Sequence, residues 1–174
     1  TMEKEDIGDL LPERPRFSHK GTYGHALLIA GSYGMMGAAL LAGESCLRAG
    51  TGLVTLHVPG YGYGIVQTGF PEGLVSLDPS VTSFSEPPDT DRYTAIGVGP
   101  GIGRAEDTEK GLKKLLEKAR AVPMVIDADG LNILSAHPEW YGLIPRGAIL
   151  TPHPKEFDRL AGESENSFQR HLKQ

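Results

Sequence analysis

Residues 25–37, HALLIAGSYGMMG, set a pattern that the rest of the chain repeats, in which an apolar run stops at a glycine. The run His25–Ala30 predicts a buried strand. The turn Gly31–Gly37 then leads into small residues that predict a helix over Ala38–Ala49, ended by Gly50. A strand, a glycine-rich turn and a helix form the first part of a βαβ unit, so we expect a parallel sheet.

The same alternation continues along the chain. Further strands are predicted at Leu53–Val58, Leu74–Leu77, Thr94–Val98, Met124–Asp127 and Ala148–Thr151. Helices are predicted near Ile65–Gly69, over Glu106–Arg120, from Leu131–Leu134 onward and from Lys155–Leu160 onward. This order predicts an α/β fold whose mostly parallel central sheet is covered on both faces. We expect one domain over residues 1–174, with Thr1–Lys20 packed as an irregular arm.

The helix Glu106–Arg120 has the clearest pattern of all. Its apolar side chains recur at helical spacing, as Leu112, Leu115, Leu116 and Ala119. On the solvent-facing side the spacing predicts two ion pairs, Glu106–Lys110 and Glu109–Lys113. The apolar stripe is therefore expected to face the sheet.

The composition excludes several classes of protein. With 174 residues, 39% of them hydrophobic, the chain has enough apolar material for one folded domain. Its formal net charge of -5 lacks the basic surplus of a sequence-independent nucleic-acid binder. The longest apolar runs, near Ala26–Ala30 and Ala38–Ala42, are far shorter than the roughly 20 residues that span a bilayer. Cys46 is the single cysteine and excludes an internal disulfide. We expect a cytoplasmic domain that binds neither nucleic acid nor membrane.

Two glycine-rich segments follow predicted strands, where open α/β sheets bind their ligands. In the first, Gly31–Gly37, the backbone can approach a ligand closely, and the next helix offers free N–H groups to an anion. The second, Gly97–Gly103, exposes backbone amides to a phosphate, although Ile102 and Arg104 break the dinucleotide spacing G-x-G-x-x-G. No Gly-Lys-Ser/Thr occurs, so neither segment is a P-loop. Each also has a plain interpretation as a tight turn.

Two polar segments follow later strands. In residues 125–132, VIDADGLN, the carboxylates of Asp127 and Asp129 could hold Mg²⁺ or orient a water molecule. Alternatively, Asp127 could cap the following helix or pair with a neighbouring backbone amide. In residues 149–156, ILTPHPKE, two prolines restrict the backbone of His153, which suits contact with a polar ligand. A metal site of Asp127, Asp129, His153 and Glu156 is conceivable, but nothing in the spacing requires it, and we predict no protein-held metal.

Taken together and in order, these segments resemble the ADP/ATP-dependent NAD(P)H-hydrate dehydratase family, which has a ribokinase-like, three-layer fold. The resemblance extends roughly from Leu11 to Gly162. The segments that carry it are SHKGTYG (18–24), AGS (30–32), GAALLA (37–42), RAGTGL (48–53), GVGPGIG (97–103), VIDAD (125–129) and LTPHP (150–154).

The resemblance implies a metabolite-repair lyase. In this family a nucleotide, ADP in bacterial members and ATP in eukaryotic ones, phosphorylates the hydroxyl of the (S)-hydrate of NADH or NADPH (NADHX, NADPHX). Phosphate then leaves and the reduced cofactor is restored. The resemblance also implies Mg²⁺ with the nucleotide, ADP in preference to ATP for this chain, and a homo-oligomer. The substrate-contacting positions of the family correspond to Ala38, Gly101 and His153, and we add as weaker candidates Gly37, Gly99, Asp127 and Asn132.

The sequence also departs from the family pattern. The family has a lysine-glycine strand segment that helps hold the nucleotide, and a Gly-Ser/Thr-Gly-Asp motif whose aspartate is the general base; neither occurs here. The catalytic residue is therefore unknown. We expect the C-terminal portion of the fold to be missing, the 174 residues alone to be inactive or nearly so, and an apolar sheet edge or face to be exposed after Ala148–Thr151. A second chain could supply the remainder. The alternatives are a vitamin-precursor kinase of the same fold and a catalytically dead nucleotide-binding domain.

Overall fold

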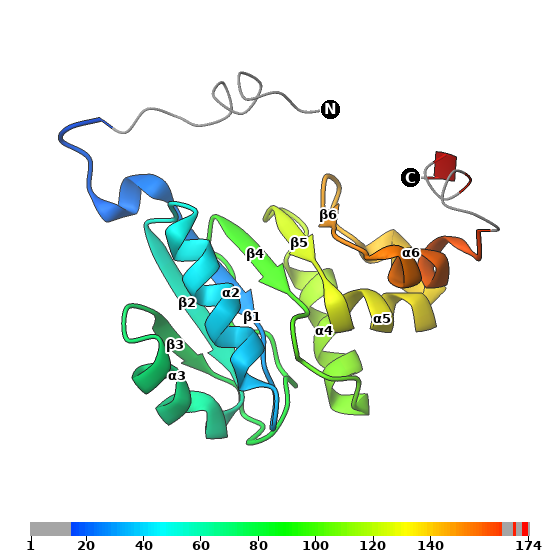
Figure 1. Ribbon diagram of the computed structural model, residues 1–174, viewed down its shortest axis with the longest axis horizontal. Coiled ribbons are helices and arrows are strands. Elements are labelled where there is room, and N and C mark those ends of the chain that lie inside the picture. Colours follow the sequence, from blue (N-terminus) through cyan, green and yellow to red (C-terminus); the bar gives the residue numbers. More distant parts are fainter. Residues whose placement is uncertain (1–14, 165–168, 170–171, 174) are drawn as a thin grey trace.

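A six-stranded parallel sheet forms the centre of the computed structural model, which describes residues 15–164, 169, 172 and 173. Its strands are β1 (His25–Ile29), β2 (Leu53–Val58), β3 (Leu74–Leu77), β4 (Ala95–Val98), β5 (Met124–Ile126) and β6 (Ile149–Leu150). They lie in the order β3-β2-β1-β4-β5-β6 (Figure 1). Residues 1–14 of the predicted arm Thr1–Lys20 lie outside the described residues.

Helices lie on both faces of the sheet, giving three layers (Figure 1). They are α2 (Met36–Arg48), α3 (Tyr63–Gly69), α4 (Glu106–Lys118), α5 (Ala128–Ala136) and α6 (Pro154–Ala161), with short 3₁₀ turns η1 (Lys20–Tyr23), η2 (Gly60–Gly62) and η3 (Pro138–Leu143). Side chains of α2 and α3 pack with β2 in one apolar cluster, whereas α4, α5 and η3 pack with β1, β4 and β5 in the other. The predicted α/β fold with a parallel sheet is confirmed.

Helix α4 confirms its predicted apolar stripe and corrects one of its ion pairs. Its leucines are fully buried, and Lys110 Nζ lies 2.6 Å from Glu106 Oε1. The prediction of an ion pair between Glu109 and Lys113 is wrong, because Glu109 Oε2 lies 3.3 Å from His137 Nε2 instead. The 3₁₀ turn η3, which follows α5 along the chain, packs beside α4, and its N-cap residue His137 contacts this side of the helix.

Most predicted boundaries differ from the structure by one or two residues, and those of α2, β6 and α5 bear on the site. Helix α2 begins at Met36 rather than at Ala38, and β6 contains only two residues. Helix α5 begins at Ala128, directly after β5, rather than near Leu131. Ala128 has a φ of 48°, a left-handed backbone that an L-residue adopts at a cost of about 1 kcal/mol. The chain thus turns from strand to helix almost without a connecting loop.

The face of the sheet that carries α2 is covered over only half its width. A row of paired residues crosses this face from strand to strand: Leu56, Leu28, Gly97, Val125 and Ile149. Leu56 is 0% exposed beneath the helices, but Val125 is 38% and Ile149 59% exposed. The predicted apolar exposure after Ala148–Thr151 is therefore confirmed, at the edge strand β6.

Helices of the length and apolar character needed to cross a membrane are absent from the part of the chain that the structure describes.

Candidate functional site

The strand order places a switch point between β1 and β4. From β1 the chain moves to β2 on one side, and it returns on the other side with β4. In such sheets ligands bind outside the carboxyl ends of the two strands at this point. The two glycine-rich segments of the sequence leave from these two strand ends (Figure 1).

The two segments are held directly against each other. The Gly31 amide donates to the Pro100 carbonyl over 2.8 Å, and the Ser32 hydroxyl donates to the Gly101 carbonyl over 2.8 Å. Gly101 has a φ of +67°, and a Cβ built on it would lie 2.8 Å from Cβ of Ala38. A side chain at position 101 would therefore push the two walls of the crevice apart.

The N-terminus of α2 opens into this crevice. Met35 occupies the N-cap position, and its side chain makes no capping hydrogen bond. The amide of Ala38 donates to the Met35 carbonyl over 3.2 Å, so the unpaired amides of the first turn are those of Met36 and Gly37. Nothing lies within 4 Å of a Cβ built on Gly37. The amides that can bind an anion are thus those of Met36 and Gly37, two residues earlier than a helix beginning at Ala38 would place them.

Helix α5 closes the other side of the glycine loop. Gly99 has a φ of +130°, and a Cβ on it would lie 1.8 Å from the Asp127 carbonyl oxygen, so only glycine fits. The Asp129 carboxylate accepts the Gly103 amide over 3.0 Å. Asp127 stands at the N-cap position of α5 without a side-chain capping bond, so the capping interpretation is wrong. Its half-buried carboxylate lines the hollow beside the crevice.

His153 makes hydrogen bonds to the first turn of α6. Its Nδ1 accepts the amides of Lys155 and Glu156 over 3.2 and 3.4 Å, and its own amide donates to Glu156 Oε2 over 3.0 Å. Because Nδ1 accepts, Nε2 carries the proton that faces Glu156 Oε1 at 3.2 Å. His153 therefore caps α6, and its contact with a ligand stays a prediction.

The remaining candidate, Asn132, also lies toward α6. Its Oδ1 accepts Nη1 of Arg159 over 2.6 Å, which joins α5 to α6. Strand β6 stands two places from β4 in the sheet, about 10 Å away at the usual strand spacing. The structure therefore brings Gly37, Ala38, Gly99, Gly101 and Asp127 together and places His153 and Asn132 on the neighbouring α6 side.

A hollow of about 450 Å³ runs from the crevice over the uncovered half of the sheet. Its lining includes Pro100, Asp127 and Thr151 at the carboxyl ends of the strands, and Leu28, Gly97 and Val125 on the sheet face. One charged group, Asp127, thus borders a surface that is mostly apolar.

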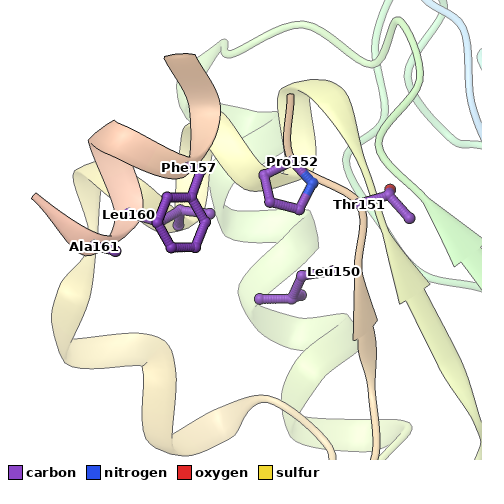
Figure 2. A pocket seen from close by; sticks show the side chains of 6 residues that line it. All are labelled: Leu150, Thr151, Pro152, Phe157, Leu160 and Ala161. Carbon is purple, nitrogen blue, oxygen red and sulfur yellow. The ribbon is translucent and has the colours of Figure 1, made fainter. Parts of the chain in front are cut away.

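A second hollow, of about 570 Å³, lies between β6 and α6. Figure 2 shows Leu150 and Phe157 beside this space, with Thr151 turned to the other side of the strand. Leu160 and Ala161 complete its apolar wall. It contains neither glycine-loop amides nor a carboxylate, and we interpret it as a further part of the uncovered sheet edge.

Sequence reasoning missed a buried network around His57 and Asp78. Both side chains are buried, and His57 Nε2 lies 3.2 Å from Asp78 Oδ2. Burial raises the pKa of Asp78, but hydrogen bonds from His57 and Ser85 outweigh it and hold that pKa well below its usual range. The available signal was an aspartate followed by closely spaced serines at 80, 83 and 85.

Comparison with solved structures identifies the class of fold. A ribokinase-like superfamily protein from Enterococcus faecalis superposes with a TM-score of 0.78 at 24% identity, covering 93% of this chain and 57% of that one, which shows the fold alone. The ADP/ATP-dependent NAD(P)H-hydrate dehydratase from Bacillus subtilis, co-crystallized with ATP/Mg²⁺, has a TM-score of 0.74 at 34% identity over 92% of this chain and 55% of that one. The fold and its crevice therefore define a ribokinase-like α/β protein.

Comparison of sequences then gives the family. A family model described as NAD(P)H-hydrate dehydratase matches residues 26–174. The bifunctional NAD(P)H-hydrate repair enzyme Nnr of Coxiella burnetii is 39% identical over 97% of this chain and 33% of its own length. The ADP-dependent (S)-NAD(P)H-hydrate dehydratase of Bacillus subtilis is 35% identical over 96% of this chain and 58% of its own length. The chain belongs to the NAD(P)H-hydrate dehydratase family, and it spans only part of the length of these relatives.

Proposed function

We propose that this chain binds the hydrate of NADH or NADPH in the crevice between β1 and β4, as part of a nucleotide-dependent hydrate dehydratase. The supporting observation is the convergence of two glycine loops at the switch point, where Gly101 lies directly against Ala38. Family membership supports the substrate class. The single cysteine, with no disulfide partner, fits a cytoplasmic protein.

The chemistry is a phosphoryl transfer followed by an elimination. The terminal phosphoryl group of the nucleotide passes to the hydroxyl oxygen of the hydrate, whose proton is taken by a base. The C–O bond then breaks and phosphate departs with the bonding electrons, while the adjacent ring carbon loses a proton whose C–H electron pair forms the restored ring double bond. We propose ADP as the donor in preference to ATP, supported by the name of the 35% identical relative.

Within this scheme the chain supplies binding and orientation. The free amides at the start of α2 suit the phosphate groups of the substrate, because a helix N-terminus attracts anions. Gly99 and Gly101 let the backbone approach closely, and the Asp127 carboxylate can accept a hydrogen bond from a ligand hydroxyl. We propose that His153 and Asn132 contact the substrate from the α6 side, supported by the 55% exposure of the His153 side chain.

Magnesium enters with the nucleotide in this proposal. Across the described residues, no three His, Cys, Asp or Glu side chains gather closely enough to hold a metal ion. Mg²⁺ is commonly bound through substrate phosphates with only one or two protein carboxylates. When bound it neutralises the charge on the transferred phosphoryl group.

The general base and part of the nucleotide site are proposed to come from another polypeptide segment, either a second chain or the remainder of a longer one. The uncovered half of the sheet supports this, since Val125 and Ile149 present apolar side chains to solvent there. We also propose that the complete enzyme is a homo-oligomer. The 174 residues alone are then expected to bind the hydrate and to turn it over weakly or not at all.

Calorimetry with NADH hydrate and an absorbance assay for NADH formation test this proposal together. We expect hydrate binding, little repair with ADP or ATP, and restored repair when the remaining part of a relative's domain is added. Gly101→Ala should abolish binding, because its Cβ meets Ala38. Gly147→Ala is the matched control, since Gly147 also has a positive φ, of +83°, and a Cβ built on it has nothing within 4 Å. Repair by the chain alone would overturn the inactivity, and absence of hydrate binding would overturn the function.

A further inference from the structure

The loop between β3 and β4 folds around one buried carboxylate. Asp78 Oδ1 accepts the Ser80 amide over 2.8 Å and the Ser85 hydroxyl over 2.5 Å. Asp78 Oδ2 accepts the amides of Ser85 and Glu86 over 2.8 and 3.0 Å. These donors lie at both ends of the segment 80–86, so the carboxylate ties the two ends of the loop together.

His57 fixes the carboxylate to the sheet. Its Nε2 lies 3.2 Å from Asp78 Oδ2 and 3.0 Å from the Glu86 carbonyl oxygen. Both partners only accept, so Nε2 carries a proton and donates. Its Nδ1 lies 3.0 Å from the Ser76 hydroxyl on β3. Because His57 belongs to β2, the loop takes its position from a strand that is paired on both sides within the sheet.

The tip of the same loop reaches the crevice through main-chain hydrogen bonds. The Thr82 carbonyl accepts the Tyr33 amide over 2.8 Å, within the glycine turn that follows β1. The carbonyls of Ser80 and Val81 accept the amides of Gly60 and Tyr61 over 2.9 and 3.1 Å. The rings of Tyr33 and Tyr61 lie 4.9 Å apart at the same place. One loop thus holds the glycine turn and η2 in a fixed relation.

We propose that His57 and Asp78 are positioning residues of the hydrate crevice. They fix residues 80–82, of which Thr82 holds the turn Gly31–Gly34 through the Tyr33 amide, and so set where the amides at the start of α2 point. The inference rests on the proposed function for the identity of the ligand, but the mechanical coupling between Asp78 and Tyr33 does not depend on it.

Site-resolved amide hydrogen exchange tests the coupling without a ligand. Asp78→Asn keeps the size of the side chain but replaces one of the two acceptor oxygens by an NH₂ donor. At the Oδ1 position this donor opposes the Ser80 amide, and at the Oδ2 position it opposes the amides of Ser85 and Glu86. A lost charge-assisted hydrogen bond corresponds to roughly a 10- to 100-fold change. We expect the amides of Tyr33, Gly60 and Tyr61 to exchange at least about ten times faster, while the exchange rates of the leucine amides of α4 stay unchanged.

Two further variants keep the test decisive. Lys114→Ala removes the exposed ion pair with Glu86 on the same loop and is expected to leave the Tyr33 amide unchanged. Ser85→Ala removes one hydroxyl bond to Asp78 and serves if Asp78→Asn fails to fold; we expect a smaller acceleration at Tyr33. Faster exchange at Ser85 and Glu86 without any change at Tyr33 would overturn the inference, as would uniform acceleration throughout the protein.

Calorimetry with NADH hydrate on the same variants separates the two proposals. If the unmodified chain binds the hydrate, Asp78→Asn should weaken binding by at least about ten-fold while Lys114→Ala does not. Unchanged binding beside faster exchange at Tyr33 would overturn the positioning role. If the unmodified chain does not bind the hydrate, the proposed function fails, and the exchange result still decides whether the coupling exists.

Discussion

The two halves of one sheet face differ in burial although their strands are similar in composition. Over β2 the side chain of Leu56 is completely buried, and over β5 and β6 the side chains of Val125 and Ile149 are open to solvent. All three point to the same side of the sheet, as the strand register requires. The difference is the presence of α2 and α3 over the first half alone.

This contrast shows that an apolar strand sequence indicates that both faces of the strand can be buried. It does not show that this chain buries both faces. Strands buried on both faces carry near-continuous apolar runs, and β5 carries such a run in Met124–Ile126. In the structure Met124 and Ile126 are buried against α4 and α5, while Val125 between them is not. The open half of the sheet therefore has the apolar side chains that a covering layer would bury.

The largest effect is expected at the junction of the two halves, where β4 ends. Gly99→Ala would place a Cβ 1.8 Å from the Asp127 carbonyl at a φ of +130°. Strain and overpacking together should lower the free energy of unfolding by about 4 kcal/mol, measured by urea denaturation. Gly34→Ala, at a φ of +84° in open space, is the control and should cost about 1 kcal/mol. Equal costs for the two variants would show that the junction is not tightly packed.

Truncation within the row tests the contrast directly. Leu56→Ala removes a fully buried side chain from the covered half and should cost about 3 kcal/mol of unfolding free energy. Val125→Ala, on the open half, should cost less than about 1 kcal/mol because its side chain is 38% exposed. A cost at Val125 equal to that at Leu56 would mean that the open half is covered in solution.

Helix α6 borders the open half, and its start depends on one side chain. His153→Ala removes the acceptor for the amides of Lys155 and Glu156 and should cost about 1 kcal/mol. Hydrogen exchange should show the first turn of α6 opening before the rest of the domain. Tyr141→Phe, which removes the hydroxyl bond to the Leu160 carbonyl at the other end of α6, provides a comparison in which that first turn should keep its protection. A first turn that stays protected in His153→Ala would contradict the capping role.

The smallest effect on stability is expected at the exposed edge. Ile149→Ser should change the unfolding free energy by no more than about 0.5 kcal/mol, because the side chain is 59% exposed. It should nevertheless reduce self-association of the chain in sedimentation velocity, since exposed apolar edges recruit partners. Unaltered association would exclude this strand from any interface that the chain forms.

The sequence was informative about the sheet because glycines and prolines mark the ends of its strands. The bounds of β2 and β3 were predicted to the residue, and the apolar stripe of α4 was predicted completely. The start of α5 was not, because the left-handed backbone of Ala128 lets the helix follow β5 at once, and no residue type announces such a turn.

The segments that form the candidate site could be predicted from the sequence, but the contacts between them could not. The two glycine loops could be placed at strand ends from their sequence, but the packing of Gly101 on Ala38 requires the pairing of β1 with β4, which local patterns do not contain. Asp129 rather than Asp127 binds the loop amide, and spacing alone could not distinguish the two carboxylates. The His57–Asp78 network joins residues on two strands and a loop, and it was missed for the same reason.

The strand order also governs how the chain is made on the ribosome. One edge of β1 pairs with β2 early in synthesis, whereas the other edge waits for β4, which ends at Val98. At about 5–20 residues per second, the interval between the completion of β2 and of β4 is roughly two to eight seconds. During that interval the middle strand of the future sheet has a free edge, which nascent-chain chaperones can protect. When β4 docks, it ends this exposure and builds the second wall of the crevice in the same event.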